Sequence, residues 1–341
     1  MAVTQIADVV VPAEFTSYVV QNTMERTALF QSGVAVRNGE IEAQLSAGAD
    51  MFTVPHWNDL GNEEANIVND NPADESTPYK INAGKQIVRK SFLHNSWSAM
   101  NLASELSGDN ALPRIQERVT AYWDRQMQRR LVASLNGILA DNIANDGGDM
   151  VRSIAAATVG AITANTRFNA TGVIEAAGTL GDAMRDLVAI AMHSDTYEHA
   201  LKNDLIETVQ QSDGGFIQTF RGLAVIVDDG MPFTPAAGPD AADAAAVYTT
   251  VLFGRGAVGY GVTAPRVAKG TQIEDKPSAG NGGGQQILHS RVNLAIHPAG
   301  FRWLEGSVAL ESPSIAELAL ATNWTREFER KAIPLAFLRH N

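Results

Sequence analysis

The chain has 341 residues, of which 45% are hydrophobic and 19% are charged, a balance typical of a globular protein with about two compact units. Its 38 acidic residues outnumber 26 basic ones and give a net charge of -12, which argues against a chain that wraps nucleic acid with its whole surface. The absence of cysteine excludes disulfides, thiolate metal sites and cysteine nucleophiles. No apolar run approaches the ~20 residues that span a bilayer, so we expect no membrane partner.

The first 50 residues are predicted to form an extended arm that contains one short helix. Pro12 suits the first turn of that helix, and Gly33 suits its end. The rest of this segment cannot form a core of its own, so we expect it to become ordered against neighbouring structure.

Residues 51–92 are predicted to form a projecting loop with a strand on each side, at residues 51–57 and 79–92. A structureless stretch as long as 58–80 is uncommon inside a compact domain, so we expect it to project from the surface. It carries Glu63, Glu64, Asp70, Asp74 and Glu75.

Residues 109–144 are predicted to form one long helix, because apolar residues recur at helical spacing. At 1.5 Å per residue, about 30 residues make a rod on the order of 45 Å long, which suggests a spine. One side of this helix is basic and carries Arg114, Arg118, Arg125, Arg129 and Arg130. That side is either a solvated helix face or the seat of an acidic partner surface or of nucleic acid.

The rest of the chain mixes helices and strands without a repeating βαβ rhythm and therefore predicts an α+β fold. Helices are predicted at residues 169–188 and 194–210, with a shorter one after Pro313. The predicted strands are residues 187–193, 216–220, 223–228, 248–253, 261–269, 287–298 and 333–338. Residues 270–286, which contain three consecutive glycines, are predicted to form a loop.

Gly254, Gly256 and Gly259 form a GxGxxG pattern directly after a predicted strand, as in dinucleotide-binding sites. Such a site needs a helix to begin at the third glycine, whereas Gly261 and Pro265 follow here. We therefore favour a glycine-rich bend between two strands, and a nucleotide-dependent enzyme is the alternative.

His193, Ser194, Asp195 and His199 cluster where a predicted strand meets a predicted helix. They could form a metal or catalytic site, but Ser194 as the N-cap and Asp195 in the first turn explain the pattern more simply. We therefore expect no catalytic residue, cofactor or metal, and projecting segments that require a partner.

The order of these elements resembles the major capsid proteins of tailed bacteriophages with the Hong Kong 97 type fold. Residues 9–35 are similar to the N-terminal arm of that family, and residues 51–92 are similar to its extended loop. Three further stretches carry the resemblance: WSAMNLASELSGDNALPRIQERVTAYWDRQMQRRLVASLNGIL, then GLAVIVDDGMP with YTTVLFGRGAVGYG, and finally SPSIAELALATNW.

The resemblance implies a division of the chain into an arm, a loop and two domains. Residues 1–50 would be the N-terminal arm, and residues 51–92 the extended loop with its flanking strands. The peripheral domain, with the spine helix 109–144, would comprise residues 93–154 and 256–311. The axial domain would comprise residues 155–255 and 312–341.

The resemblance also implies a function: self-assembly, through hexamers and pentamers, into an icosahedral virion capsid around double-stranded viral DNA. Assembly would occur in the host cytoplasm, with separate scaffolding, portal and cement proteins as further partners. The extended loop would contact an adjacent subunit, with Glu63, Glu64, Asp70, Asp74, Glu75, Arg114 and Arg118 as contact candidates. The basic candidates for the inner, DNA-facing surface are Arg125, Arg129 and Arg130. A cellular protein-cage shell of the same fold is a further alternative.

Overall fold

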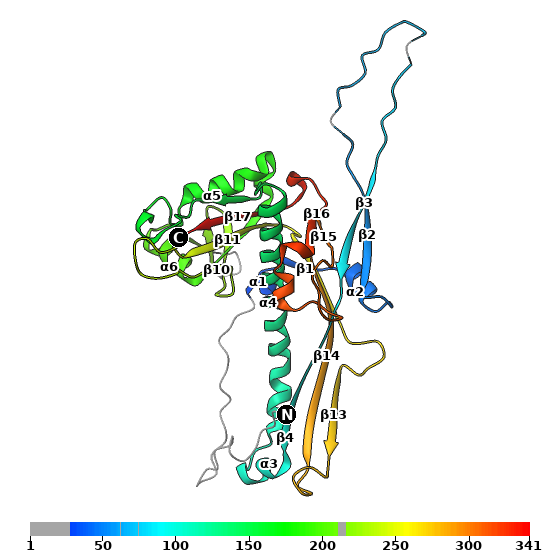
Figure 1. Cartoon of the computed structure of the whole chain (residues 1–341), viewed down its shortest axis with the longest axis vertical. Helices are drawn as coiled ribbons and strands as arrows, with labels where there is room; N and C mark the ends of the chain where they lie inside the picture. Colours follow the sequence, from blue (N-terminus) through cyan, green and yellow to red (C-terminus); the bar gives the residue numbers. More distant parts are fainter. Residues whose placement is uncertain (1–27, 62, 74, 211–215) are drawn as a thin grey trace.

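The computed structural model describes residues 28–61, 63–73, 75–210 and 216–341. Figure 1 shows an elongated molecule in which one long helix, α4, runs through the centre. A broad sheet lies beside one end of α4, a narrow arm of long strands runs beside the other, and a two-stranded hairpin projects away from both.

The described part of the N-terminal region contains two short helices and one strand: α1 (Ala28–Gln31), β1 (Ala35–Arg37) and α2 (Gly39–Leu45). Asn38 caps α2, because its side chain accepts a hydrogen bond from the Glu40 backbone N–H at 2.8 Å. The predicted helix start at Pro12 lies outside the described residues. Gly33, the predicted stop, follows α1 and has a φ of +77°.

The predicted spine helix is confirmed as α4 (Ala111–Asn145). The Asn110 side chain accepts a hydrogen bond from the Leu112 N–H at 3.1 Å and so caps the start. Beyond the end of α4, Gly147 and Gly148 have φ values of +67° and +72°, a left-handed conformation that favours glycine. A seven-residue helix, α3 (Asn101–Ser107), precedes α4.

A five-stranded sheet forms the narrow arm, and β14 (Gln285–Pro298) is its centre. One edge of β14 pairs with β4 (Ser91–Met100), while the other pairs first with β13 (Thr271–Lys276) and then with β12 (Val258–Thr263). β1 adds to β12 in parallel. The strand β13 lies within residues 270–286, so the prediction of a loop there was wrong for its first half.

An eight-stranded mixed sheet forms the broad unit beside the other end of α4. Its strand order is β5 (Val151–Ser153), β17 (Leu335–His340), β11 (Val247–Gly254), β6 (Leu187–Met192), β9 (Leu223–Val227), β8 (Phe216–Phe220) and β7 (Glu207–Gln210), with β10 (Phe233–Thr234) beside β11. The residues of β11 from Val251 to Phe253 are fully buried. This sheet therefore has a core on both faces.

Two predicted helices are shorter in the structure. The one expected at 169–188 is α5 (Ala170–Ala177) followed by 3₁₀ turns over Gly178–Asp186, because Gly181 interrupts it with a φ of +64°. The one expected at 194–210 is α6 (Ser194–Lys202), and the chain then turns at Asp204, whose φ is +53°, into β7.

Three of the remaining C-terminal elements pack on α4: α7 (Ile315–Leu318), the 3₁₀ turn at Ala321–Asn323 and β16 (Trp324–Arg326). β15 (Phe301–Trp303) pairs with β16, and the 3₁₀ turn at Arg330–Ala332 lies against the 3₁₀ turns of Gly178–Asp186. The indole N–H of Trp324 donates to the Leu318 carbonyl at 2.8 Å. Among the helices of the described residues, none is both long and apolar enough to cross a membrane.

Two elements relate differently to the sheets than the predicted domain boundaries imply. β5 falls in the expected peripheral range 93–154, yet it pairs with β17 in the eight-stranded sheet. β16 falls in the expected axial range 312–341, yet it pairs with β15 and packs against α4.

Candidate intersubunit surfaces

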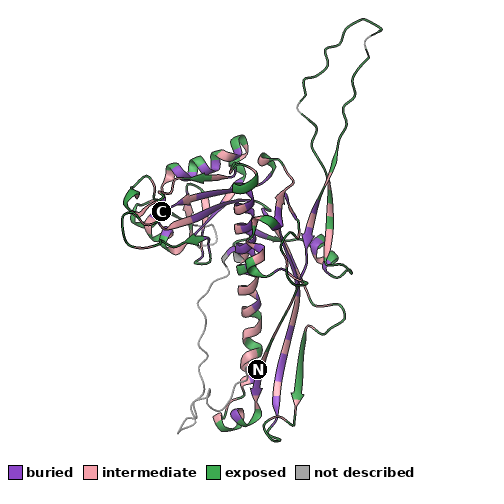
Figure 2. Ribbon diagram, viewed as in Figure 1, coloured by how far each residue is buried: buried purple, intermediate pink, exposed green. Residues whose placement is uncertain are grey.

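A hairpin of β2 (Met51–Trp57) and β3 (Ala83–Arg89) carries the projecting loop. The strands pair antiparallel with Met51 opposite Arg89 and Trp57 opposite Ala83. Every described residue from 58 to 82 is exposed, and Figure 2 shows the described residues of the outer part of the hairpin in the colour of exposed residues. Fully extended, the roughly 12 residues of each half could reach at most about 40 Å beyond the strands at ~3.3 Å per residue.

The acidic side chains of this loop are exposed to solvent. Glu63, Glu64, Asp70 and Glu75 are exposed, and Asp74 lies outside the described residues. The loop points away from the spine-helix end that carries Arg114 (Figure 1). In the structure none of the loop residues Glu63, Glu64, Asp70 and Glu75 pairs with Arg114 or Arg118 of the same chain, so any such pairing has to join two chains.

The loop also carries an apolar pair that the sequence analysis missed. Ile67 is 87% exposed and Val68 is 93% exposed. Burying such a side chain stabilises a protein by about 1.5–3 kcal/mol, and this chain does not bury either one. The available signal was two adjacent aliphatic residues in the middle of a polar segment.

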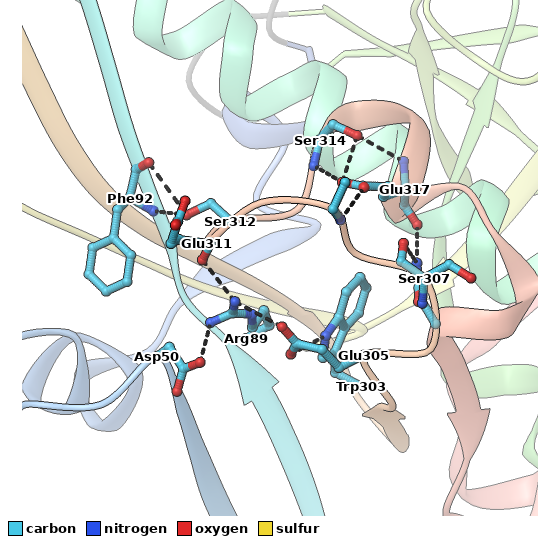
Figure 3. Close-up of polar contacts among 12 residues, drawn as sticks. Asp50, Arg89, Phe92, Trp303, Glu305, Ser307, Glu311, Ser312, Ser314 and Glu317 are labelled. Atoms are coloured by element: carbon cyan, nitrogen blue, oxygen red, sulfur yellow. Dashed lines mark hydrogen bonds and ion pairs between the residues drawn. The ribbon is translucent and has the colours of Figure 1, made fainter.

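The root of the hairpin is fixed to the body of the subunit by Arg89, whose side chain is only 5% exposed. Figure 3 shows its guanidinium between Asp50 and Glu305, with contacts of 3.1 and 2.9 Å, and donating to the Glu311 carbonyl at 2.8 Å. The Trp303 indole N–H donates to the same Glu305 carboxylate at 3.1 Å. A planar guanidinium with several donors suits such a multiple contact.

Lys90 provides a second anchor at the root. It is fully buried, its Nζ donates to the Ala47 carbonyl at 2.8 Å, and it lies over the Phe52 ring, 5.8 Å from the centroid. Burial lowers the pKa of Lys90. Nearby, the Phe92 N–H donates to Ser312 Oγ at 2.9 Å (Figure 3). The direction of the hairpin is therefore set by contacts with three separate segments of the body.

The basic residues of the first half of α4 differ in how far their charge is already compensated. Arg114 lies 3.4 Å from Asp109 and 3.7 Å from Glu117 and is 43% exposed. Arg118 is half-buried on the same helix. Arg125 is half-buried and Arg129 is exposed, and both have partners within the chain.

Arg130 is not a surface residue, so its assignment to a DNA-facing surface was wrong. Its side chain is buried and donates to the Ser91 hydroxyl at 3.3 Å and to the Pro313 carbonyl at 2.9 Å. Burial lowers the pKa of Arg130 to about 10. The cause is its place on the helix: Arg130 lies one turn before Ser134, on the face that packs against β4 and the segment before α7.

The two clusters that resembled enzyme sites have structural roles in this fold. Gly254 ends β11 and β12 begins at Val258, with Gly256 at a φ of +68° between them. The predicted bend between two strands is thus confirmed.

At the other cluster, His193 rather than Ser194 caps α6, because its Nδ1 accepts from the Asp195 N–H at 3.2 Å. Tyr248 donates its hydroxyl to Asp195 at 2.8 Å, and burial together with this carboxylate raises the pKa of Tyr248 to about 12. In the described ranges, no group of three or more His, Asp or Glu side chains could hold a metal ion.

The anchored hairpin displays a long loop with exposed acidic and apolar side chains, beside a spine helix and two sheets, an arrangement typical of a subunit that contacts other chains. No protein-family model matches the chain. It is 36% identical over 343 residues to the major capsid protein of Bacillus phage SPP1, covering 100% of this chain and 99% of that protein.

Solved structures extend the similarity to the fold. The capsid of Ralstonia phage GP4 matches with a TM-score of 0.60 and 10% identity over 96% of this chain and 95% of that chain. The cyanophage Pam1 capsid matches with a TM-score of 0.58 and 10% identity over 96% of each chain. The chain therefore belongs to the major capsid proteins of tailed bacteriophages, with the Hong Kong 97 type α+β fold.

The predicted fold class and the predicted role as a structural protein of a phage capsid shell are both confirmed. The capsid function is supported over the nucleotide-dependent enzyme and the cellular protein cage, because the full-length relative is a phage capsid protein.

Proposed function

We propose that this chain assembles through hexamers and pentamers into an icosahedral shell around double-stranded viral DNA, without catalytic activity, in the host cytoplasm. The observation that carries the proposal is the hairpin of β2 and β3. Its root is locked into the subunit by Arg89 and Lys90, while its loop presents acidic and apolar side chains to solvent. A rigid root with an unburied tip suits a contact to another subunit.

The domain division belongs to this proposal. The arm of residues 1–50 and the loop of 51–92 would connect subunits, while residues 93–154 and 256–311 would form the peripheral domain around α4. Residues 155–255 and 312–341 would form the axial domain. The pairing of β5 with β17, and of β15 with β16, favours moving residues 151–153 to the axial domain and residues 312–326 to the peripheral one.

The acidic loop would contact basic groups on an adjacent subunit. Glu63, Glu64, Asp70, Asp74 and Glu75 are its candidates, and Arg114 and Arg118 are their candidate partners. Exposed ion pairs contribute about 0.2–1 kcal/mol each, but a closed shell repeats the contact in every subunit, which multiplies the effect.

Arg125 and Arg129 are the remaining candidates for a weak, sequence-independent contact with packaged DNA. Separate scaffolding, portal and cement proteins would complete the particle. A shell subunit of net charge -12 would repel DNA from most of its surface, which suits a container that does not bind its contents tightly.

Nuclease protection tests DNA enclosure. Particles that contain this chain, isolated from infected cells, should hold DNA that resists nuclease until denaturant opens the shell. DNA that is digested at once in intact particles would contradict enclosure. The absence of catalysis is tested separately: NAD and ATP should leave the melting temperature unchanged, and a shift that disappears in Gly256→Ala would contradict it.

A further inference from the structure

The loop between β12 and β13, residues 264–270, stands out from the edge of the five-stranded sheet in Figure 1. Arg266, Val267 and Lys269 are exposed on it, and Val267 is 91% exposed. Arg291 of β14 holds its base: the backbone N–H donates to the Gly270 carbonyl at 2.7 Å, and Nη1 donates to the Lys269 carbonyl at 3.1 Å. We call residues 264–270 with Arg291 the basic knob.

The basic knob presents cations whose charge is not compensated locally. Within the part of the chain that the structure describes, neither Arg266 nor Lys269 forms an ion pair. Arg114 on the spine helix, by contrast, already contacts Asp109 and Glu117. A carboxylate that arrives from another chain therefore gains more at the knob than at Arg114, where it would compete with two carboxylates already in place.

The projecting loop of residues 58–80 has the complementary surface. Both surfaces have an exposed aliphatic apex, Val267 on the knob and Ile67 with Val68 on the loop. The charges around these two apices are opposite in sign, because Glu63, Glu64 and Asp70 lie close in sequence to the aliphatic pair.

The two surfaces cannot meet within one molecule. The hairpin extends upward in Figure 1, away from the basic knob beside β13, and its root is fixed by Arg89. The knob can therefore contact such a loop only on a second molecule. A second copy of this chain carries that loop.

DNA is the less suitable occupant of the knob. The strongly exposed Val267 at the apex gains nothing from phosphate. A short acidic segment with its own aliphatic residues can place each group separately.

We propose that the basic knob of one copy binds the acidic projecting loop of a second copy, with Arg266 and Lys269 pairing with carboxylates around a contact between Val267 and the Ile67–Val68 pair. This assignment rests on the proposed shell function and names a receiving surface for the loop other than Arg114, whose charge is already compensated.

Charge reversal with rescue tests the assignment. The double variant Arg266→Glu, Lys269→Glu should lower the assembled fraction at low salt at least tenfold, measured by sedimentation. Adding Glu63→Lys and Glu64→Lys to it should restore most of that loss, because the pairs are re-formed with reversed sign. Arg118→Glu is the matched control and should show neither the loss nor the rescue.

Crosslinking gives an independent readout, because the chain has no cysteine and introduced thiols are therefore the only reactive ones. A short bismaleimide should join Glu64→Cys, Lys269→Cys chains into a ladder longer than dimers, whereas each single variant stops at dimers. A ladder from Glu64→Cys, Arg118→Cys instead would overturn the knob assignment and leave the loop as an intersubunit element.

Two other outcomes separate the knob from the proposed function. Suppose that the variant Arg266→Glu, Lys269→Glu assembles normally but packages less DNA, and that Glu64→Cys, Lys269→Cys forms no crosslinked ladder. The knob would then face DNA, and the assignment would be wrong. If deleting residues 59–79 leaves shell formation intact, the loop does not join subunits, and the intersubunit role under the proposed function fails together with the knob.

Discussion

The guanidinium of Arg89, at the root of the projecting hairpin, lies 2.9 Å from the carboxylate of Glu305, just beyond β15. Arg89→Gln removes a buried cation from beside Glu305 and Asp50 and should lower the free energy of unfolding by roughly 2–4 kcal/mol, toward the range for a broken buried ion pair. The measurement is urea denaturation of the unassembled subunit.

Lys85→Gln is the matched control for Arg89. Lys85 lies on the same strand but is exposed, so its replacement should change stability by less than about 0.5 kcal/mol. Equal effects of the two substitutions would show that Arg89 does not anchor the root.

Gly137, in the buried half of α4, should not tolerate alanine. Alanine normally favours a helix by about 1 kcal/mol over glycine, but here a Cβ would collide with the Leu318 carbonyl and the Trp324 indole. Gly137→Ala should therefore lower the melting temperature, whereas Gly39→Ala, where a Cβ meets nothing within 4 Å, should not. A Gly137→Ala protein as stable as the wild type would contradict this packing.

Two buried histidines should make stability fall with acidification. His297 lies 2.9 Å from the Gln86 amide oxygen, and burial lowers the pKa of His297 to about 4. Burial also lowers the pKa of His340 to about 4. An unfolded histidine titrates near pH 6.5, so between about pH 6.5 and 4 the unfolded chain binds more protons than the folded one.

Each of these histidines should therefore cost about 1.4 kcal/mol of stability per pH unit through that window, and the loss should level off below about pH 4. Unfolding curves measured across this range should show a shallower dependence for His297→Gln than for the wild type. Identical slopes would show that the His297 side chain does not stay neutral in the folded state.

The apolar tip of the projecting loop should matter for assembly and not for folding. Ile67→Ser with Val68→Ser should leave the melting temperature of the unassembled subunit unchanged, since both side chains are already exposed. It should reduce the assembled fraction, because an aliphatic contact between subunits is lost. Thr77→Ser on the same loop is the control; equal assembly of both variants would contradict an apolar tip contact.

The elements with strong periodicity were predictable from the sequence. The spine helix, the strand at 51–57 and the turn at Arg221 and Gly222 all formed, the last with φ values of +48° and +86°. The strand β13 was not predicted because its residues from Thr271 to Asp275 are all exposed. A strand with no buried face has no alternation of apolar and polar residues in its sequence. Gly181 and Asp204 ended helices that propensity alone would extend.

The candidate surfaces were only partly predictable. A run of acidic residues without apolar support identified the projecting loop, but its anchor at Arg89 left no signal, because a basic residue in a strand normally indicates a solvent-facing position. The prediction that Arg130 faces the inside of the shell was also wrong. Its burial depends on contacts with Ser91 and Pro313, which come from distant parts of the chain.

The mass and appearance of the purified full-length chain test the shell account most directly. Sedimentation with negative-stain imaging, over a range of protein and salt concentrations, should show capsomers or closed shells, with assembly strengthening as salt is lowered, since attractive exposed charges are screened less. A single monomeric species at every protein and salt concentration would contradict the account.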